Sequence, residues 1–364
     1  MLEKFVQQLN QSESLSDEQI VAAVAQLTDE TISAETKADF LTAFSKKGET
    51  VEELAAFARE LRDKSVQPKL DPETRSREIL DVCGTGGDHL NTFNISTTVA
   101  LLAASAGVTV AKHGNRAVTS QSGSADVLEA LGIKIDLSPE QAAESLRLHN
   151  FAFFFAPKFH PAFKHLALAR KICAQRGQRT VFNLLGPLLN PARPTAQLIG
   201  VPRPSFCEPM ARVLQSLGIR RGMVVSGEVG NGRTSNIQHR TSNIESSPSY
   251  LDEFSTLGNT YVAEFYQERG FSSSTMSPEN FPLQPASLKD LAGGDSKTNA
   301  EIVRQIFSGE ERGPKLDAVL LNGAAALMVA GKTKSLSEGW EFAKSLIAEG
   351  KATEKLQELV RFSA

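Results

Sequence analysis

A glycine-rich turn, Asp81-Val-Cys-Gly-Thr-Gly-Gly-Asp88, follows a short apolar run at 78–82 that predicts a β-strand. Asn94-Ile-Ser-Thr97 then opens an alanine-rich segment that predicts a helix to residue 106, with Asn94 as its N-cap and Gly107 as its stop. A second strand is predicted at Val108-Thr-Val-Ala111, so the unit is βαβ. The first N–H groups of a helix lack partners and carry partial positive charge, so this turn suits an anion.

A lysine and a second turn strengthen this interpretation. Lys112 ends the second strand, where a dinucleotide site would carry an acidic residue. His89 stands where the dinucleotide fingerprint needs glycine, and the sequence has no Gly-Lys-Ser/Thr of a Walker loop before the helix. Ser120-Gln-Ser-Gly-Ser124 precedes another predicted helix, at 125–131. Two such turns with a lysine between them indicate a ligand with two phosphate-bearing ends.

Composition excludes several classes of protein. The chain has 364 residues and a formal net charge of −3, which argues against a nucleic-acid-binding surface across the protein. Cys83, Cys173 and Cys207 are too few and too scattered for a disulfide framework or a zinc site. No apolar span approaches membrane length, and the N-terminus lacks a signal-peptide pattern. We therefore expect a cytoplasmic enzyme with no membrane or nucleic-acid partner.

The pattern of predicted elements changes along the chain. The first sixty or so residues read as helices, with capping boxes at Ser16-Asp-Glu-Gln19 and Thr50-Val-Glu-Glu53. Residues 65–74 carry two prolines and predict a crossing segment without helix. Strands and helices alternate beyond it, including a buried strand at 151–156, and this alternation is typical of an α/β domain.

These motifs, taken in order, resemble those of the anthranilate phosphoribosyltransferase family. The resemblance covers most of the chain, and five ordered motifs are far more specific than one glycine-rich turn. Beyond residues 81–126 it includes His160-Pro-Ala-Phe-Lys164, Arg179-Thr-Val-Phe-Asn-Leu-Leu-Gly-Pro-Leu-Leu-Asn-Pro191, Leu251-Asp-Glu253 and Asp317-Ala-Val-Leu-Leu-Asn322.

The resemblance implies an α/β fold of two domains. A small all-helical domain would cover residues 1–75 and be completed by helices from about 160–185. A larger α/β domain at 76–364 would bind phosphoribosyl diphosphate on a central, mostly parallel sheet flanked by helices. The family transfers phosphoribose from phosphoribosyl diphosphate to the amine of anthranilate, in tryptophan biosynthesis, and releases diphosphate. Its members are commonly homodimers through the helical domain.

The resemblance also implies the site residues. Catalysis would depend on positioning and electrostatics, with no nucleophile or strong general base, because the aromatic amine is already neutral at pH 7. Mg²⁺ would be held by Ser96, Asp252 and Glu253, and anthranilate would contact Asn115 and Arg170. The substrate-binding residues implied in full are Gly84, Gly87, Asp88, Thr92, Asn94, Ile95, Ser96, Thr97, Lys112, His113, Gly114, Asn115, Arg116, Ala117, Val118, Thr119, Ser120, Ser124 and Arg170.

Some points depart from the family or stay open. Ser226 replaces a histidine common in the family, and the segment 228–250 is longer and more polar than usual, which predicts a mobile loop or hairpin. Arg116 is open to a structural as well as a binding interpretation, and we expect His113 only to line the pocket. Two other functions remain, a pyrimidine nucleoside phosphorylase and a non-catalytic nucleic-acid-binding relative. The intact Lys-His-Gly-Asn-Arg116 run and the acidic pair Asp252-Glu253 favour the transferase.

Overall fold

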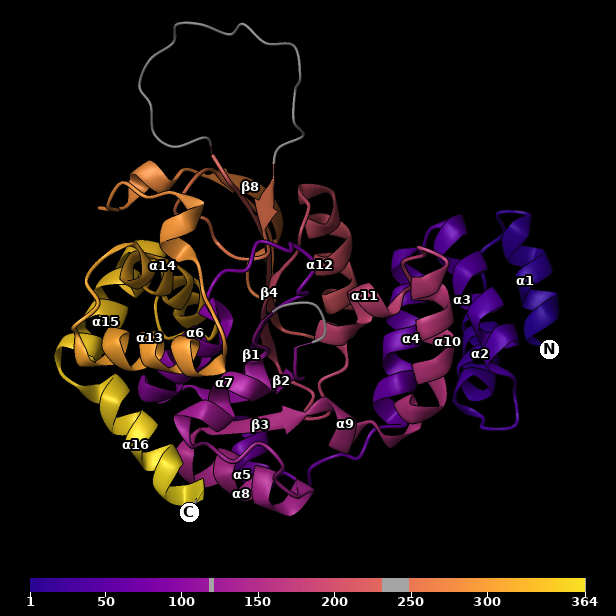
Figure 1. Ribbon diagram of the computed structural model, residues 1–364, viewed down its shortest axis with the longest axis horizontal. Coiled ribbons are helices and arrows are strands. Elements are labelled where there is room, and N and C mark those ends of the chain that lie inside the picture. Colours follow the sequence, from indigo (N-terminus) through magenta and orange to yellow (C-terminus); the bar gives the residue numbers. More distant parts are fainter. Residues whose placement is uncertain (118–120, 231–248, 364) are drawn as a thin grey trace, which may run out of the picture.

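The computed structural model describes residues 1–117, 121–230 and 249–363 (Figure 1). The predicted binding residues Val118, Thr119 and Ser120, and most of the predicted loop at 228–250, lie outside the described residues. The molecule is elongated, with a helical unit at one end and a sheet flanked by helices at the other (Figure 1).

The N-terminal helices form the first unit, and their starts follow the predicted caps. The side chain of Ser16 accepts a hydrogen bond from the Gln19 amide, and that of Thr50 accepts one from the Glu53 amide, so both capping boxes are confirmed. Phe40, Phe44 and Phe57 pack against one another inside this unit. The helices are α1 (Leu2–Asn10), α2 (Asp17–Thr28), α3 (Ala34–Lys47) and α4 (Val51–Asp63).

A later segment packs against these helices, although it comes after three strands of the sheet. Lys37 of α3 donates a hydrogen bond to the His165 carbonyl at 3.0 Å, and the Cys173 thiol donates to the Ala38 carbonyl at 3.5 Å. The helical domain is therefore discontinuous in sequence, while its limits near residues 75, 160 and 185 stay a prediction. The segment contains α9 (Ala156–Phe159), η1 (Pro161–Leu166), α10 (Ala167–Gln175), α11 (Phe182–Leu185) and η2 (Gly186–Leu188).

The crossing segment is helical at its end, contrary to the prediction. A short helix, α5 (Pro72–Ser76), begins after Asp71, whose side chain accepts from the Thr74 amide at 3.0 Å. Pro72 occupies the first turn, where backbone N–H groups have no partner within the helix, so the missing N–H of proline removes no hydrogen bond. A proline that argues against a helix interior is thus compatible with a helix start.

An eight-stranded sheet forms the centre of the second unit. Its strands run in the order β3-β2-β1-β4-β5-β7-β8, with β6 pairing β5 beside this path. The pairs from β3 to β5 are parallel, and β6, β7 and β8 add antiparallel pairs, so the predicted mostly parallel sheet is confirmed. The strands are β1 (Ile79–Gly84), β2 (Thr109–Gly114), β3 (Phe151–Phe155), β4 (Ala196–Gly200), β5 (Arg221–Glu228), β6 (Tyr250–Leu251), β7 (Thr260–Tyr266) and β8 (Gly270–Met276).

Helices cover both faces of the sheet. Met223 and Val225 of β5 belong to the apolar core shared with α6 and α14, whereas Val224 faces the core shared with α12 and the helical unit. Successive side chains of β5 therefore point into the two apolar cores on opposite faces of the sheet. The remaining helices are α6 (Ile95–Ser105), α7 (Ser124–Leu131), α8 (Pro139–His149), η3 (Pro204–Phe206), α12 (Cys207–Ser216), η4 (Pro278–Asn280), η5 (Leu288–Leu291), α13 (Ser296–Ser308), α14 (Pro314–Val329), α15 (Leu336–Ala348) and α16 (Lys351–Ser363).

The parallel strands decide where a ligand can bind. The carboxyl ends of β1, β2, β4 and β5 meet at one edge, which is where ligands bind in open α/β sheets. Both glycine-rich turns leave the sheet at this edge, the first after β1 and the second after β2. Across the described parts of the chain, no helix is both long and apolar enough to cross a membrane.

Candidate active site

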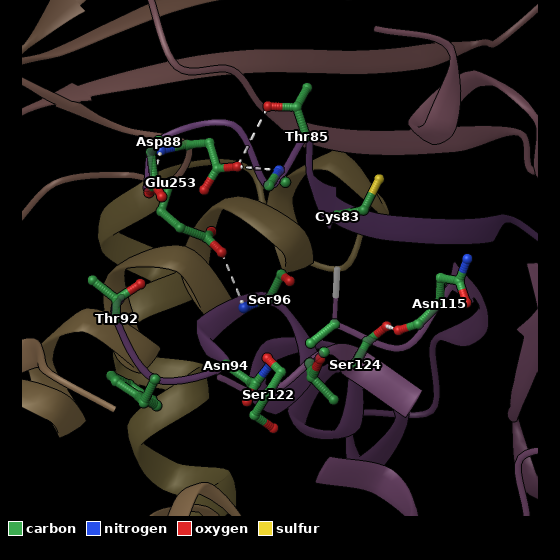
Figure 2. A pocket seen from close by; sticks show the side chains of 18 of the residues that line it. Cys83, Thr85, Asp88, Thr92, Asn94, Ser96, Asn115, Ser122, Ser124 and Glu253 are labelled. Carbon is green, nitrogen blue, oxygen red and sulfur yellow. Dashed lines mark hydrogen bonds between the residues drawn. The ribbon is translucent and has the colours of Figure 1, made fainter. Parts of the chain in front are cut away.

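A cavity of about 420 Å³ lies at the carboxyl ends of β1 and β2, in front of the first turn of α6 (Figure 2). It brings together segments that are far apart in the sequence, from the first glycine-rich turn to the acidic pair Asp252-Glu253. The predicted residues that line it are Gly84, Asp88, Thr92, Asn94, Ser96, Thr97, Lys112, His113, Gly114, Asn115, Arg116, Ala117, Ser124, Asp252 and Glu253.

Three of the other predicted residues lie elsewhere. Gly87 lines a neighbouring cavity of about 740 Å³, Ile95 is buried in the apolar core, and Arg170 lies on α10 outside both cavities. Several lining residues were not in the set implied by the resemblance, and all of them lie within or beside the two glycine-rich turns. These are Cys83, Thr85, Gly86, His89, Asn91, Phe93, Ser122 and Gly123.

Asp252 anchors the first glycine-rich turn. Its Oδ2 accepts a hydrogen bond from the Gly86 amide at 2.6 Å and lies 3.4 Å from the Thr85 hydroxyl (Figure 2). A Cβ at Gly84 would lie 2.7 Å from this oxygen, and a Cβ at Gly200 would lie only 1.4 Å from the Asp252 carbonyl oxygen. The ends of β1 and β4 therefore need glycine because Asp252 approaches both backbones.

Glu253 occupies the position at the helix start that the sequence suggested for Asn94. Asn94 is the N-cap residue of α6, as predicted, but its side chain makes no capping hydrogen bond. Instead, Glu253 Oε1 accepts from the Ser96 amide at 3.1 Å (Figure 2), while Asn94 donates to the Ser122 carbonyl at 3.2 Å. The helix N-terminus thus binds one carboxylate already, and Asn94 links the two turns.

Lys112 places an ammonium group beneath the first turn. The side chain is 1% exposed, and its Nζ donates to the Val82 carbonyl at 2.7 Å and lies 3.5 Å from Ser96 Oγ. Burial lowers the pKa of Lys112, while the nearby carboxylates, including Glu253, oppose that shift. A cation held here faces the part of the cavity formed by the β1 turn and the start of α6.

Three carboxyl groups, those of Asp88, Asp252 and Glu253, lie close together in the same region. Burial, reinforced by the neighbouring Asp88 carboxylate, raises the pKa of Asp252 to about 8, and burial next to Asp252 raises the pKa of Glu253 well above its ordinary value. A divalent cation would relieve this repulsion, so the oxygen donors fit Mg²⁺. Within the described ranges, no three acidic, histidine or cysteine side chains form a complete metal cage. Mg²⁺ needs none, because it keeps water and takes phosphate oxygens.

The second turn is closed by ion pairs. The Arg116 guanidinium donates to Asp126 at 3.0 Å and to both Glu129 oxygens at 2.8 and 3.2 Å. Asp126 Oδ2 also accepts from the Ala117 and Gly123 amides, each at 2.9 Å. These contacts support the structural interpretation of Arg116, since both carboxylates compete with any phosphate for its guanidinium.

A row of rings joins the cavity to the helical unit. The His113 and His160 centroids are 5.2 Å apart, and Phe163 follows at 4.9 Å from His160. Phe163 then contacts Phe182 at 5.6 Å, and the Arg170 guanidinium lies 5.2 Å from the Phe182 centroid. Burial lowers the pKa of His113 to about 3 and that of His160 to about 4. Both rings are therefore neutral at pH 7, and His113, which lines the cavity, brings no positive charge to it.

Comparison with known proteins agrees with this geometry. Residues 76–243 and 235–353 match the family model "Glycosyl transferase family, a/b domain", and residues 3–65 match its helical bundle domain. The fold and the matched models together define a two-domain glycosyltransferase.

Individual relatives narrow the class. An anthranilate phosphoribosyltransferase from Petrotoga mobilis is 43% identical over 363 residues, which is 100% of this chain and 97% of the relative. The crystal structure of the Thermus thermophilus enzyme superposes with a TM-score of 0.83 at 38% identity and 98% coverage of both chains. The Saccharomyces cerevisiae enzyme, solved with phosphoribosyl diphosphate and magnesium, gives 0.83 at 26% identity, covering 100% and 97%. The chain belongs to the anthranilate phosphoribosyltransferase family.

Proposed function

We propose that this protein transfers phosphoribose from phosphoribosyl diphosphate to the amine of anthranilate and releases diphosphate, a step of tryptophan biosynthesis. The observation that carries the proposal is the cavity at the sheet edge. It combines the N-terminus of α6, the Lys112 ammonium and the acidic pair Asp252-Glu253 within reach of one ligand. This combination suits a polyanion accompanied by a divalent cation.

The acceptor would bind on the side of the helical unit. Arg170 has no carboxylate partner among the residues described, so its charge is available to the carboxylate of anthranilate. The Phe182 ring orients the guanidinium, and the row of rings connects it to His113 in the cavity wall. Asn115 lines the cavity on the same strand end as His113 and would meet the amine side of the acceptor.

The residues act by orientation and charge. Anthranilate brings a neutral amine, so no group in the cavity has to remove a proton before the nitrogen attacks C1 of the ribose. Charge develops on the departing diphosphate, and the Lys112 ammonium and the positive end of the α6 dipole lie where they can stabilise it. Asp252, Glu253 and Lys112 are all at least nine-tenths buried, which strengthens the electrostatic interaction of their charges with a bound ligand.

Magnesium belongs to the same proposal. The yeast relative was solved with magnesium and phosphoribosyl diphosphate, and the oxygen donors here suit that ion. Asp252, Glu253 and Ser96 would hold it. When bound, Mg²⁺ supplies positive charge that the leaving diphosphate requires. A cation bound beside Asp252 and Glu253 would lower their pKa values again and favour the charged carboxylates.

Diphosphate release tests the proposal directly. The purified protein is incubated with phosphoribosyl diphosphate and Mg²⁺, and diphosphate is measured with anthranilate, with benzoate, or with neither. Release is expected only with anthranilate, because benzoate has the carboxylate but no amine. Release that does not depend on anthranilate, or phosphorolysis of uridine, would contradict the proposal.

The assembly also stays a proposal. Val21 on α2 and Leu168 on α10 are 44% and 59% exposed, and both are on the helical unit. Apolar side chains exposed on this unit support a homodimer formed through it. Light scattering during gel filtration should therefore give twice the chain mass, and Leu168→Glu should shift the protein toward the monomer.

A further inference from the structure

The segment before α13 lies directly against the start of α6. Thr92 and Ala292 form an isolated antiparallel bridge, and the Phe93 amide donates to the Leu291 carbonyl at 3.0 Å. A Cβ at Gly293 would lie 2.7 Å from Phe93 Cα, so the backbones touch with no room for a side chain. Residues 291–294 therefore support the 91–94 segment, which lines the cavity.

A chain of three hydrogen bonds leads from this support into the cavity. The Gly294 amide donates to Asn299 Oδ1 at 2.8 Å, and Asn299 Nδ2 donates to Asn94 Oδ1 at 2.8 Å. Asn94 Nδ2 then donates to the Ser122 carbonyl at 3.2 Å. A backbone N–H can only donate and a carbonyl oxygen can only accept. The Gly294 amide and the Ser122 carbonyl at the two ends therefore fix which way the side-chain amides of Asn299 and Asn94 point.

We infer that Asn299 is a positioning residue for phosphoribosyl diphosphate, which acts by fixing the side chain of Asn94 between the two glycine-rich turns. Asn299 is 2% exposed and does not line the cavity, whereas Asn94 and Ser122 do. Without Asn299, the Asn94 amide keeps its bond to the Ser122 carbonyl but loses the donor to its Oδ1, so the link between the start of α6 and the second turn is held at one end instead of two. The inference rests on the proposed function, because it names how that site is held in its binding geometry.

A double-mutant cycle tests it by binding rather than turnover. Calorimetry gives the Kd of phosphoribosyl diphosphate with Mg²⁺ for wild type, Asn299→Ala, Asn94→Ala and the double variant. Asn299→Ala should weaken binding about three- to tenfold, the effect of one neutral hydrogen bond. The double variant should bind no more weakly than Asn94→Ala alone, because Asn299 acts only through Asn94. The KM for anthranilate should change less than about twofold, since the acceptor is bound by other residues.

The matched control is Asp295→Ala, which weakens the same helix at a different point. The Asp295 side chain accepts from the Thr298 amide at 2.8 Å and caps α13 without touching Asn94. Asp295→Ala should lower the Tm about as much as Asn299→Ala does. It should leave the Kd of phosphoribosyl diphosphate within about twofold of wild type. Equal weakening of binding by both variants at equal loss of Tm would reduce Asn299 to a structural role and overturn the inference.

A second variant covers the case in which Asn299→Ala does not fold. Asn299→Asp keeps the acceptor for the Gly294 amide but replaces the donor that faces Asn94. Asn299→Asp should weaken the binding of phosphoribosyl diphosphate at least as much as Asn299→Ala does. In the Asn94→Ala background, Asn299→Asp should cause no further loss of binding. If the losses of binding free energy at positions 299 and 94 are additive, the inference is wrong. The proposed function is unaffected by that result as long as the wild-type protein binds phosphoribosyl diphosphate and turns over. Wild-type protein that binds no phosphoribosyl diphosphate refutes the proposed function, and the inference with it.

Discussion

Replacing Arg170 with alanine should raise the KM for anthranilate about ten- to a hundredfold and leave the KM for phosphoribosyl diphosphate nearly unchanged. The guanidinium lies 5.2 Å from the Phe182 centroid and carries no ion pair in the described part of the chain. A charge-assisted hydrogen bond to a carboxylate is worth about 1.5–3 kcal/mol, which gives that range. Phe182→Leu removes the ring and should weaken the binding of anthranilate by about 0.5–1 kcal/mol, which raises its KM about two- to fivefold.

Steady-state kinetics with each substrate varied in turn separates the two sites. Arg176→Ala is the control, because Arg176 follows the same helix but pairs with the exposed Asp39 at 2.6 Å. An exposed pair contributes less than about 1 kcal/mol, so neither KM should change. If Arg170→Ala weakened phosphoribosyl diphosphate instead, or both substrates equally, the assignment of Arg170 to the acceptor would be wrong.

Three further predictions concern the acidic pair, a glycine and a histidine. Asp252→Ala combined with Glu253→Ala should remove most turnover while the thermal melt stays cooperative, and full activity of this variant or in excess chelator would refute the metal assignment. Gly200→Ala should abolish activity and cost at least about 1–3 kcal/mol of stability, because its Cβ would lie 1.4 Å from the Asp252 carbonyl; an active, stable variant would contradict that contact. Burial lowers the pKa of His160 to about 4, so the unfolded chain binds the extra proton and stability falls as pH drops from 6.5 toward 4, by about 3 kcal/mol. Denaturant melts of His160→Phe should be correspondingly flatter over that range, and an unchanged slope would show that His160 is not the group responsible.

Local chemistry explains what the sequence could predict. The capping boxes, the strand–turn–helix at 78–106 and the buried strand at 151–156 depend on neighbours within a few positions, and each is present in the structure. The resemblance supplied the fold class and the family. The helix in the crossing segment was missed because a proline reads as a breaker unless its cap is recognised.

The details of the site depend on contacts that leave no local pattern. Glu253, rather than Asn94, binds the Ser96 amide across 157 positions, and Asn299 reaches Asn94 across 205. No local pattern indicates either pairing, although Glu253 belongs to a recognised motif and Asn299 lies on an amphipathic helix. The residue types in the cavity could be predicted from motifs, whereas their hydrogen-bond partners required the strand order that brings the distant segments together.

The discontinuous helical unit has a consequence for how acceptor choice can evolve. On the proposed assignment, the sheet edge holds the phosphoribosyl donor, while Arg170 and Phe182 are on the segment that leaves the sheet after β3 and returns at β4. Apart from Asn115 at the end of β2, the residues assigned to the acceptor thus lie on a stretch of chain separate from the donor site. Substitutions confined to residues 156–188 would then change contacts to the acceptor without changing a residue that binds phosphoribosyl diphosphate.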